Sequence, residues 1–236
     1  ADTYRLYGAG PNGQNLTNEV TSIFARQLVA MNPEGPITLD DGSINLISPT
    51  STDLLAYLST NVPSADILTP AVEDSKLHVA KDFDRDDVSR YLSEIAQMQE
   101  SITSDPIWQM SLSVNVGEDG SVNWASETGR VFEKARDRMY AMNIPEPLVD
   151  LHKSQMAFFL TMSAFMDVAA RDPVAAVALS NNLDDLVASQ SLTIEGAIKK
   201  LQSDDSGGIS LMFREDRSLL DKLLGVQVAH ATLLTF

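Results

Sequence analysis

The chain has 236 residues, of which 44% are hydrophobic and 21% charged, so it can bury a core and is too apolar to be disordered. Seventeen basic residues stand against 33 acidic ones, and the net charge of −16 repels phosphate backbones and anionic lipid headgroups. Nucleic acid is therefore excluded as an expected partner. The absence of cysteine excludes disulfides, thiolate nucleophiles and zinc–sulfur sites.

The N-terminal quarter of the chain predicts two helices joined by a hairpin. Residues 16–31 carry apolar side chains at helical spacing, with Asn15 as the N-cap and a proline-rich stretch ending the helix. Residues 37–48 alternate apolar and polar about Asp41-Gly42, which predicts a β-hairpin, with an extended half-buried loop as the alternative. A short helix over 52–59 and a long connection over 60–83 follow.

The next helix is predicted over 85–103, where Asp84 and Asp87 form a capping pair at its start. The acidic run ahead of it, with Asp82, Asp84 and Asp86 at alternating positions, resembles the opening of a calcium loop. The resemblance fails at its sixth position, Asp87 instead of Gly, and at its twelfth, Ser93 instead of Glu. We prefer the capping interpretation and keep calcium at Asp82, Asp84 and Asp86 as the alternative; no other cofactor is indicated.

Residues 105–126 fit two patterns. The stretch 111–124 alternates about Asp119-Gly120 and predicts a second hairpin, whereas the residues from Pro106 onward could open one or two helical turns. From about residue 127 to 142 a helix returns, and the prolines at 145 and 147 end it.

The central predicted element is an apolar helical hairpin over 147–190, broken at Arg171-Asp172-Pro173. Asp172 can cap the second arm and Pro173 suits its first turn, where the missing N–H would be unpaired anyway. Polar residues interrupt the apolar run at 154–170, which favours a buried bundle helix over a membrane span. The first arm carries a wide apolar stripe: Leu148, Leu151, Met156, Phe159, Met162, Phe165, Met166 and Ala169.

The C-terminal segment predicts shorter elements. Thr193 is expected to cap a short helix that ends near residue 201, and an acidic turn follows at 203–208. Residues 209–213 are predicted as a strand or a buried linker, 215–224 as a last helix, and 226–236 as an apolar tail that packs on the core or meets a partner.

No residue set dictates a reaction. His78, His152 and His230 are far apart and lack metal-ligand spacing, and no nucleophile elbow or phosphate loop is present. A carboxylate pair for glycoside hydrolysis is compatible with the composition, but nothing places two carboxylates together. Five of the nine methionines lie between 139 and 166, which is typical of core gap-filling and, alternatively, of a groove for a hydrophobic ligand or peptide.

Residues 143–186 resemble a pattern in predicted exported proteins of unknown function from small-genome candidate-phyla bacteria. That pattern has a Pro-x-x-Leu-x-x-Leu-His start, a long apolar helix, a polar break ending in Asp-Pro and a second helix. The resemblance implies a mainly helical extracytoplasmic domain and no activity, and the hairpin-like stretches 37–48 and 111–124 depart from it. The matching residues here are Pro145, Leu148, Leu151, His152, Asp172 and Pro173.

These patterns together predict a mainly α fold, an irregular helical bundle around the hairpin at 147–190 with one or two small β-hairpins. We expect one helical domain over 1–236, with 1–104 and 105–236 as candidate lobes. The first residue, Ala1, with no apolar leader after it, favours an exported, extracytoplasmic protein. The expected function is non-enzymatic: a structural or interaction protein of the cell envelope or a surface assembly, which contacts itself or other envelope proteins through apolar termini or a hairpin edge. The alternative is a binding module that uses the Met-rich groove.

Overall fold

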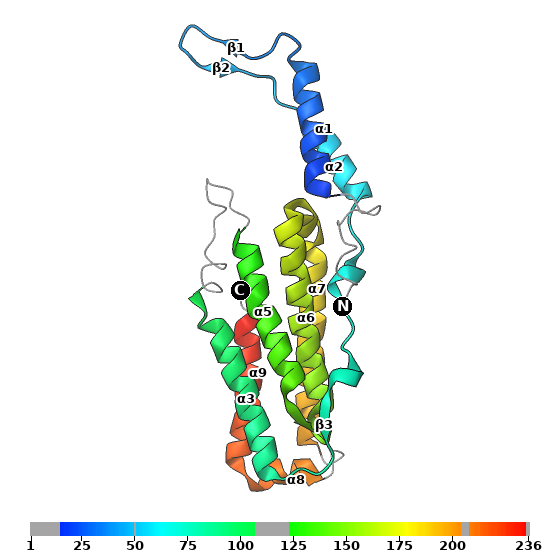
Figure 1. The fold of residues 1–236 in the computed structure, drawn as a ribbon, viewed down its shortest axis with the longest axis vertical. Coiled ribbons are helices and arrows are strands. Elements are labelled where there is room, and N and C mark those ends of the chain that lie inside the picture. Colours follow the sequence, from blue (N-terminus) through cyan, green and yellow to red (C-terminus); the bar gives the residue numbers. More distant parts are fainter. Residues whose placement is uncertain (1–14, 50, 107–122, 204–207, 235–236) are drawn as a thin grey trace. The chain divides into compact units, whose positions relative to one another are not determined.

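The structure is a computed structural model that describes residues 15–49, 51–106, 123–203 and 208–234. It is mainly α, a packed helical bundle with two very small sheets, and this confirms the predicted class (Figure 1). The α-helices are α1 (Leu16–Met31), α2 (Ser51–Thr60), α3 (Arg85–Thr103), α5 (Asn123–Ala141), α6 (Val149–Arg171), α7 (Pro173–Gln202), α8 (Gly208–Glu215) and α9 (Arg217–Leu234). The short elements are the 3-10 helices η2 (Ala65–Leu68), η3 (Asp74–Lys76) and η4 (Glu146–Leu148), and the strands β1 (Ile37–Thr38), β2 (Ile44–Asn45), β3 (His78–Ala80) and β4 (Asn143–Pro145).

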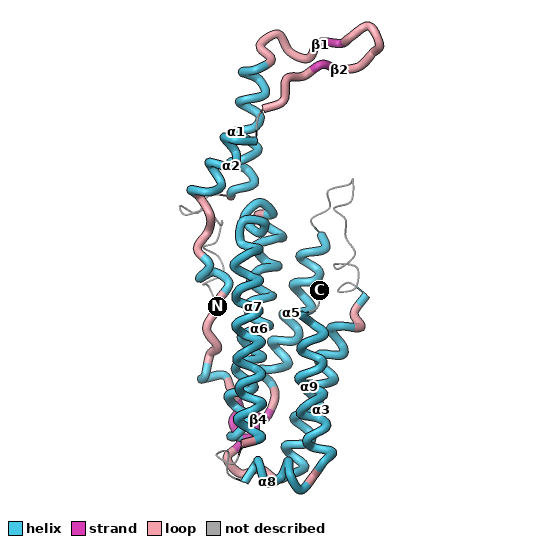
Figure 2. The backbone as a smooth tube through the Cα atoms, turned by 180° about the vertical axis from the view of Figure 1, so that it is seen from behind, coloured by secondary structure: helices cyan, strands magenta, loops and turns pink. Residues whose placement is uncertain are grey.

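The chain divides into two compact units. Unit 1 comprises Ala1–Ser64 with Arg171–Ser180, and unit 2 comprises Ala65–Ala170 with Asn181–Phe236. The division falls after residue 64 and not at residue 104, because α3 packs along α9 within unit 2 (Figures 1 and 2). A boundary at 104 would separate these two packed helices.

The core of unit 2 is built from the apolar stripes that the sequence predicts on α3, α5 and α6. Phe132, Phe158 and Phe159 form an aromatic cluster at its centre, with ring centroids 5.5 to 6.4 Å apart. Such tilted and edge-on contacts contribute about 1 kcal/mol each beyond the apolar area that the rings bury. The α3 stripe consists of Val88, Tyr91, Leu92, Ile95, Met98 and Ile102, all buried as their spacing predicts.

A parallel pair of strands joins two segments of unit 2 that the sequence does not associate. His78 pairs with Asn143 and Ala80 with Pro145, so β3 lies beside β4. The sequence predicts only a plain connection over residues 60–83, and that prediction misses this contact. Three residues carry too little periodicity to indicate a strand, and parallel pairing adds no turn signal.

Asp172, at the break between α6 and α7, caps α7 as predicted. It also has a second role that the sequence does not indicate. The Asp172 carboxylate accepts a hydrogen bond from Ala175 N at 3.2 Å, within the first turn of α7. It also accepts from Leu16 N at 2.6 Å and from Thr17 N at 3.0 Å, at the start of α1. One buried carboxylate, only 1% exposed, therefore caps two helices of unit 1.

Two further contacts complete this double cap. The Thr17 hydroxyl donates to Asp172 Oδ1 at 2.8 Å and accepts from Val174 N at 3.1 Å. The Asn15 side chain accepts from Asn18 N as the predicted N-cap, and it donates to Arg171 O at 2.7 Å. Every donor in this group has a partner, which is the condition for burying a charge at acceptable cost.

Three predictions for the C-terminal half are wrong. Thr193 does not start a new helix, because its hydroxyl donates to Ser189 O one turn back and α7 continues to Gln202. Residues 209–213 form helix α8 rather than a strand, with Ile209 and Phe213 buried one turn apart. The last helix, α9, extends to Leu234 instead of ending near residue 224; burial of Val226 in the core agrees with the predicted packing of the apolar tail.

The predicted hairpin at 111–124 lies outside the described residues, except for Asn123 and Trp124, where α5 begins. The predicted hairpin at 37–48 is confirmed, with β1 and β2 as its paired strands.

Removing the double cap should destabilise the protein. We expect Asp172→Ala to lower the free energy of unfolding by about 2–4 kcal/mol, because it leaves the first amides of two helices without an acceptor. Urea unfolding measures the loss, and faster hydrogen exchange at the Leu16, Thr17 and Ala175 amides would locate it. Asp172→Asn keeps one acceptor oxygen, so its free energy of unfolding should lie between those of wild type and Asp172→Ala.

The matched control is Asp184→Ala, which removes an exposed carboxylate in the middle of α7. Its effect should stay within about 0.5 kcal/mol. Equal effects of the two alanine variants would contradict the double-cap interpretation.

Candidate interaction surface

The β1–β2 hairpin is closed by the turn that the sequence predicts. Ile37 pairs with Asn45 and Thr38 with Ile44 in an antiparallel register. Gly42 takes a φ of +80°, which its missing Cβ permits, and Gly42 N donates to Leu39 O at 2.9 Å. Asp41 Oδ1 accepts from the Ser43 hydroxyl and from Ser43 N, and these bonds hold the pKa of the Asp41 carboxyl below its usual value.

The hairpin is fixed to the end of α1 by the side chain of Asn32. The Asn32 amide donates to Ile47 O and accepts from Ile47 N, both at 2.9 Å, as a neighbouring strand would. The same amide donates to Leu28 O in the last turn of α1. The hairpin is therefore held by a polar clamp while its own apolar side chains remain exposed.

The apolar hairpin, defined as residues 37–48, exposes large side chains on both of its faces. Because paired residues share a face and successive residues alternate, Ile37, Leu39 and Ile47 lie on one face and Ile44 and Leu46 on the other. Their side chains are 55%, 45%, 57%, 64% and 41% exposed, respectively. The described residues place no further strand beside β1 or β2, so the outer edges of both strands are open.

The helices of unit 1 add to this apolar surface. Leu16 is the only residue of α1 that is buried. Of the fifteen large apolar side chains that are exposed among the described residues, ten lie between residues 24 and 62. Outside the hairpin these are Phe24, Val29, Met31, Leu55 and Val62. Such a concentration on one segment of a folded domain is typical of a contact surface.

The acidic run that suggested calcium is organised for capping. Asp84 Oδ1 accepts from Asp87 N at 2.9 Å and Asp87 Oδ2 accepts from Asp84 N at 3.1 Å, which makes a reciprocal capping box. The backbone amide of Asp84, together with the nearby Arg90, lowers the pKa of the Asp87 carboxyl. In the part of the chain that the structure describes, no three acidic or histidine side chains are placed to hold a metal ion, so Asp82, Asp84 and Asp86 are not brought together as ligands.

The histidines belong to three different elements: His78 is on β3, His152 on α6 and His230 on α9. His152 is fully buried, and its Nδ1 lies 3.1 Å from the hydroxyl of Tyr91, which is itself 2% exposed. Its Nε2 has no hydrogen-bond partner among the described residues. Burial lowers the pKa of His152 to about 4 and raises that of the Tyr91 phenol.

This buried histidine gives the stability a pH dependence of defined sign. The unfolded side chain titrates near 6.5 and the folded one near 4, so the unfolded state binds the extra proton between these values. The contribution of neutral His152 to the free energy of unfolding is fully present above pH 6.5. It decreases as the pH falls from 6.5 towards 4, and it does not decrease further below pH 4. The full loss is about 3 kcal/mol.

Comparison of wild type with His152→Gln isolates this effect from the titration of the many carboxylates. Glutamine can still accept from Tyr91 but does not titrate, so between pH 7 and 4.5 it should lose less unfolding free energy than wild type by about 2–3 kcal/mol. Urea unfolding at the two pH values measures the difference. Parallel pH profiles for the two proteins would contradict the assignment.

The Met-rich stripe on α6 is part of the core. Met156 and Phe159 are buried, while Met162 and Phe165 are partly buried and pack against the same core. The surface grooves beside α3 and beside α8 are lined by other residues. No observation in the described part of the chain therefore favours a hydrophobic-ligand site at these four side chains.

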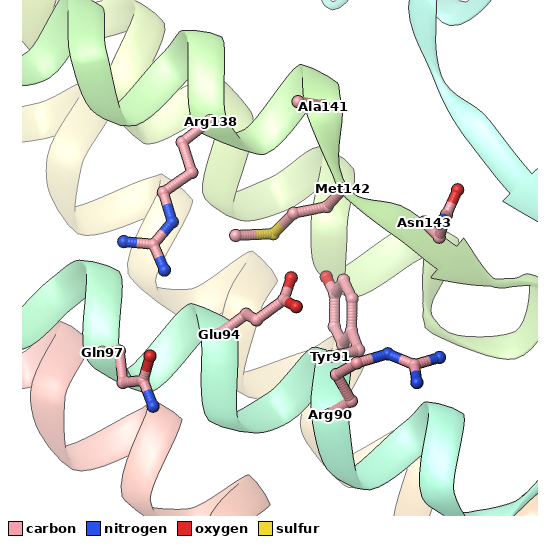
Figure 3. A pocket seen from close by; sticks show the side chains of 8 residues that line it. All are labelled: Arg90, Tyr91, Glu94, Gln97, Arg138, Ala141, Met142 and Asn143. Carbon is pink, nitrogen blue, oxygen red and sulfur yellow. The ribbon is translucent and has the colours of Figure 1, made fainter.

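A groove of about 400 Å³ lies between α3 and the end of α5 (Figure 3). Tyr91 and Met142, both buried, form its floor, and Glu94 and Arg138 project into it from facing helices. We name this the α3–α5 groove; Arg90, Gln97, Ala141 and Asn143 complete its lining. Sequence reasoning missed it, because α3 and α5 carry no motif that pairs these residues.

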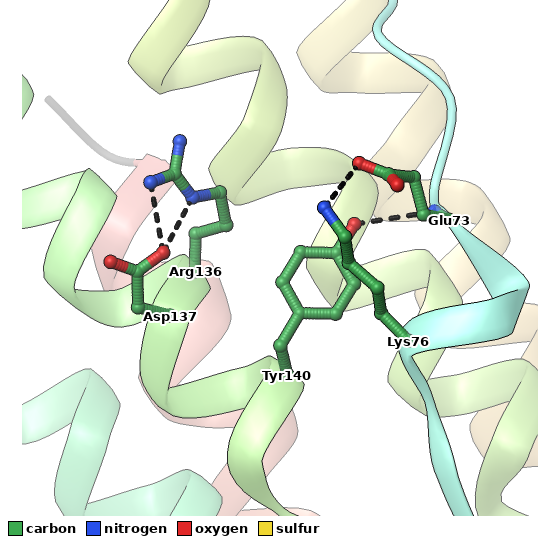
Figure 4. A network of polar contacts seen from close by, with 5 residues as sticks. All are labelled: Glu73, Lys76, Arg136, Asp137 and Tyr140. Carbon is green, nitrogen blue, oxygen red and sulfur yellow. Dashed lines mark hydrogen bonds and ion pairs between the residues drawn. The ribbon is translucent and has the colours of Figure 1, made fainter. Parts of the chain in front are cut away.

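The polar residues between α5 and η3 are arranged differently (Figure 4). Arg136 pairs with Asp137 at 2.8 Å and Lys76 with Glu73 at 2.7 Å, while Tyr140 Oη accepts from Glu73 N at 3.2 Å. The Lys76 ammonium also lies 5.6 Å from the centre of the Tyr140 ring. The hydrogen bond between Lys76 and Glu73 raises the pKa of the lysine and lowers that of the glutamate. These charges are satisfied by one another.

Comparison with known proteins adds no assignment: no family model matches the chain, and no curated protein or solved structure shows significant similarity to it. Among the described helices, each lacks the combination of length and hydropathy that crossing a membrane requires.

Proposed function

We propose that this chain is a non-enzymatic structural protein of the cell envelope or of a surface assembly, and that it associates with a second copy of itself through the apolar hairpin. The observation that supports the proposal is the exposure of five large aliphatic side chains on a hairpin with two open edges among the described residues. Natural proteins blunt such edges with lysine, proline or bulges unless the edge is used. The paired strand residues 37–38 and 44–45 carry no such device.

A second copy suits this surface better than an unrelated partner does. The same open edge on two copies can pair antiparallel about a two-fold axis, which makes the contact self-complementary. The strands carry no charge, whereas the chain as a whole carries −16, so two copies repel one another everywhere except at such an uncharged segment. The nearest charges, Asp40 and Asp41, lie at the turn and outside the strand pairs.

The expected affinity of one copy of the chain for another is modest. A half-exposed leucine or isoleucine contributes about 1 kcal/mol when it becomes buried, so five from each copy set an upper limit of about 10 kcal/mol. Association costs about 4–15 kcal/mol in lost freedom, and edge hydrogen bonds add a small gain. The balance predicts a reversible, concentration-dependent association, which repetition in an assembly would strengthen.

Two observations support a non-enzymatic role. Asp172 is the only buried carboxylate in the described chain, and all of its hydrogen bonds cap helices or orient Thr17. The imidazole of His152 is fully buried against the Tyr91 hydroxyl and lines neither surface groove, so it is shielded from solvent. The extracytoplasmic location rests on the resemblance of residues 143–186 to exported proteins. Fractionation of native cells tests it, and recovery with cytoplasmic markers alone would contradict it.

Self-association is tested by placing a charge in the middle of the pairing surface. Sedimentation velocity across a concentration series should show wild type moving from monomer to larger species. Ile44→Lys should shift that transition to concentrations at least about tenfold higher, because the buried edge would hold an unpaired ammonium.

The matched control is Leu192→Lys, which adds the same charge to a side chain of similar exposure, 69% against 64%, on α7 in unit 2. It should associate like wild type. A wild-type chain that stays monomeric at every concentration, or equal effects of the two lysine variants, would contradict the proposal.

A further inference from the structure

The α3–α5 groove in unit 2 holds two opposite charges that the described residues leave without a partner. Within the described part of the chain, no hydrogen bond or ion pair engages the guanidinium of Arg138 or the carboxylate of Glu94, although both project into the same hollow (Figure 3). Arg90, on the rim, is already paired with Asp87. As far as the described residues go, the groove therefore offers a free cation and a free anion on facing helices.

This arrangement differs from the rest of the charged surface around it. Arg136 and Arg138 are two residues apart on α5, yet Arg136 pairs with Asp137 whereas Arg138 points into the groove. Acidic residues outnumber basic ones by 33 to 17 in this chain, so an arginine beside a carboxylate has every opportunity to form a direct pair. Here Arg138 and Glu94 lie too far apart for an ion pair, so a molecule placed between them can contact both.

The floor of the groove is formed by two core side chains that expose little surface. The Met142 thioether extends between the two charged side chains, the Tyr91 ring lies beside Glu94, and Ala141 adds a methyl group at the rim. The floor is firmly held, because Tyr91 is buried in the core and its hydroxyl contacts His152. A volume of about 400 Å³ lies at the small end of the range for small-molecule sites.

We propose that the α3–α5 groove binds a small zwitterion, a free amino acid. Arg138 receives the α-carboxylate and Glu94 receives the α-ammonium, above the floor formed by Tyr91 and Met142. A fork of guanidinium donors matches a carboxylate in two parallel hydrogen bonds, which fixes the orientation of the ligand. This inference is independent of the hairpin, since the groove and the hairpin belong to different units.

The test uses three probes with the same side chain and different charges: L-methionine, N-acetyl-L-methionine, in which a neutral acetamide replaces the ammonium, and L-methioninamide, in which a neutral amide replaces the carboxylate. Titration followed by two-dimensional NMR should shift the amide signals of Gln97, Ala141 and Asn143, with a dissociation constant of about 0.1–1 mM for L-methionine. Each single-charge probe should bind about tenfold more weakly, because it leaves one of the two groups unsatisfied.

Variants assign each charge to its partner. Arg138→Gln should weaken the binding of L-methionine by about tenfold. It should leave the binding of L-methioninamide unchanged, since that probe has no carboxylate. Glu94→Gln should weaken the binding of L-methionine to a similar extent. It should leave the binding of N-acetyl-L-methionine unchanged, since that probe has no ammonium. Arg136→Gln is the matched control, because it removes the same charge from the same helix outside the groove, and it should alter none of the three.

Three results would overturn the proposal. The first is the absence of shifts at these amides with L-methionine, which would mean that Arg138 and Glu94 close on one another instead. The second is equal binding of the three probes. The third is an equal loss in Arg136→Gln and Arg138→Gln, which would reduce the effect to net charge. Because Arg138 is exposed, an unchanged circular dichroism spectrum is expected and separates lost binding from lost folding.

Discussion

The buried carboxylate of Asp172 is the interaction on which the arrangement of unit 1 depends. It accepts amide hydrogen bonds from the first turns of α1 and α7, which are about 155 residues apart in the chain. The positive ends of two helix dipoles compensate its charge, and Thr17 adds a hydroxyl donor. The hairpin follows α1 and is clamped to it by Asn32, so the position of the apolar surface within unit 1 depends in turn on this one acceptor.

Polar groups inside unit 2 impose a different constraint. The side-chain amides of Gln99 and Gln155 are buried and have no hydrogen-bond partner among the described residues, as is the case for Nε2 of His152. Each such group offsets core stability by about 1–3 kcal/mol. Gln190 donates to Thr161 at 2.8 Å between α7 and α6, a contact that is lost if the two helices slide by one turn. Polar positions in a bundle of otherwise interchangeable apolar stripes favour one register over others.

The two proposed contacts use complementary properties of the same acidic chain. Net repulsion limits association to an uncharged surface, and the hairpin provides one in unit 1. Unit 2 instead presents a groove in which an arginine and a glutamate face one another without pairing. Binding of a zwitterion in unit 2 would alter self-association through unit 1 only if the two sites were energetically coupled. Because the hairpin and the groove belong to different units, variants can disrupt one contact without touching the other.

The sequence by itself determined the local elements. The bounds of α1 and α3, the hairpin turn at Gly42, the capping box of Asp84 and Asp87 and the break at Asp172 follow from signals within a few residues, because caps and turns are satisfied locally. Only the tertiary structure decided the continuation of α7 past Thr193, the pairing of β3 with β4, the second helix capped by Asp172, and the meeting of Glu94 with Arg138. These depend on groups distant in the chain, and the free energy that settles them comes from packing, which no local pattern records.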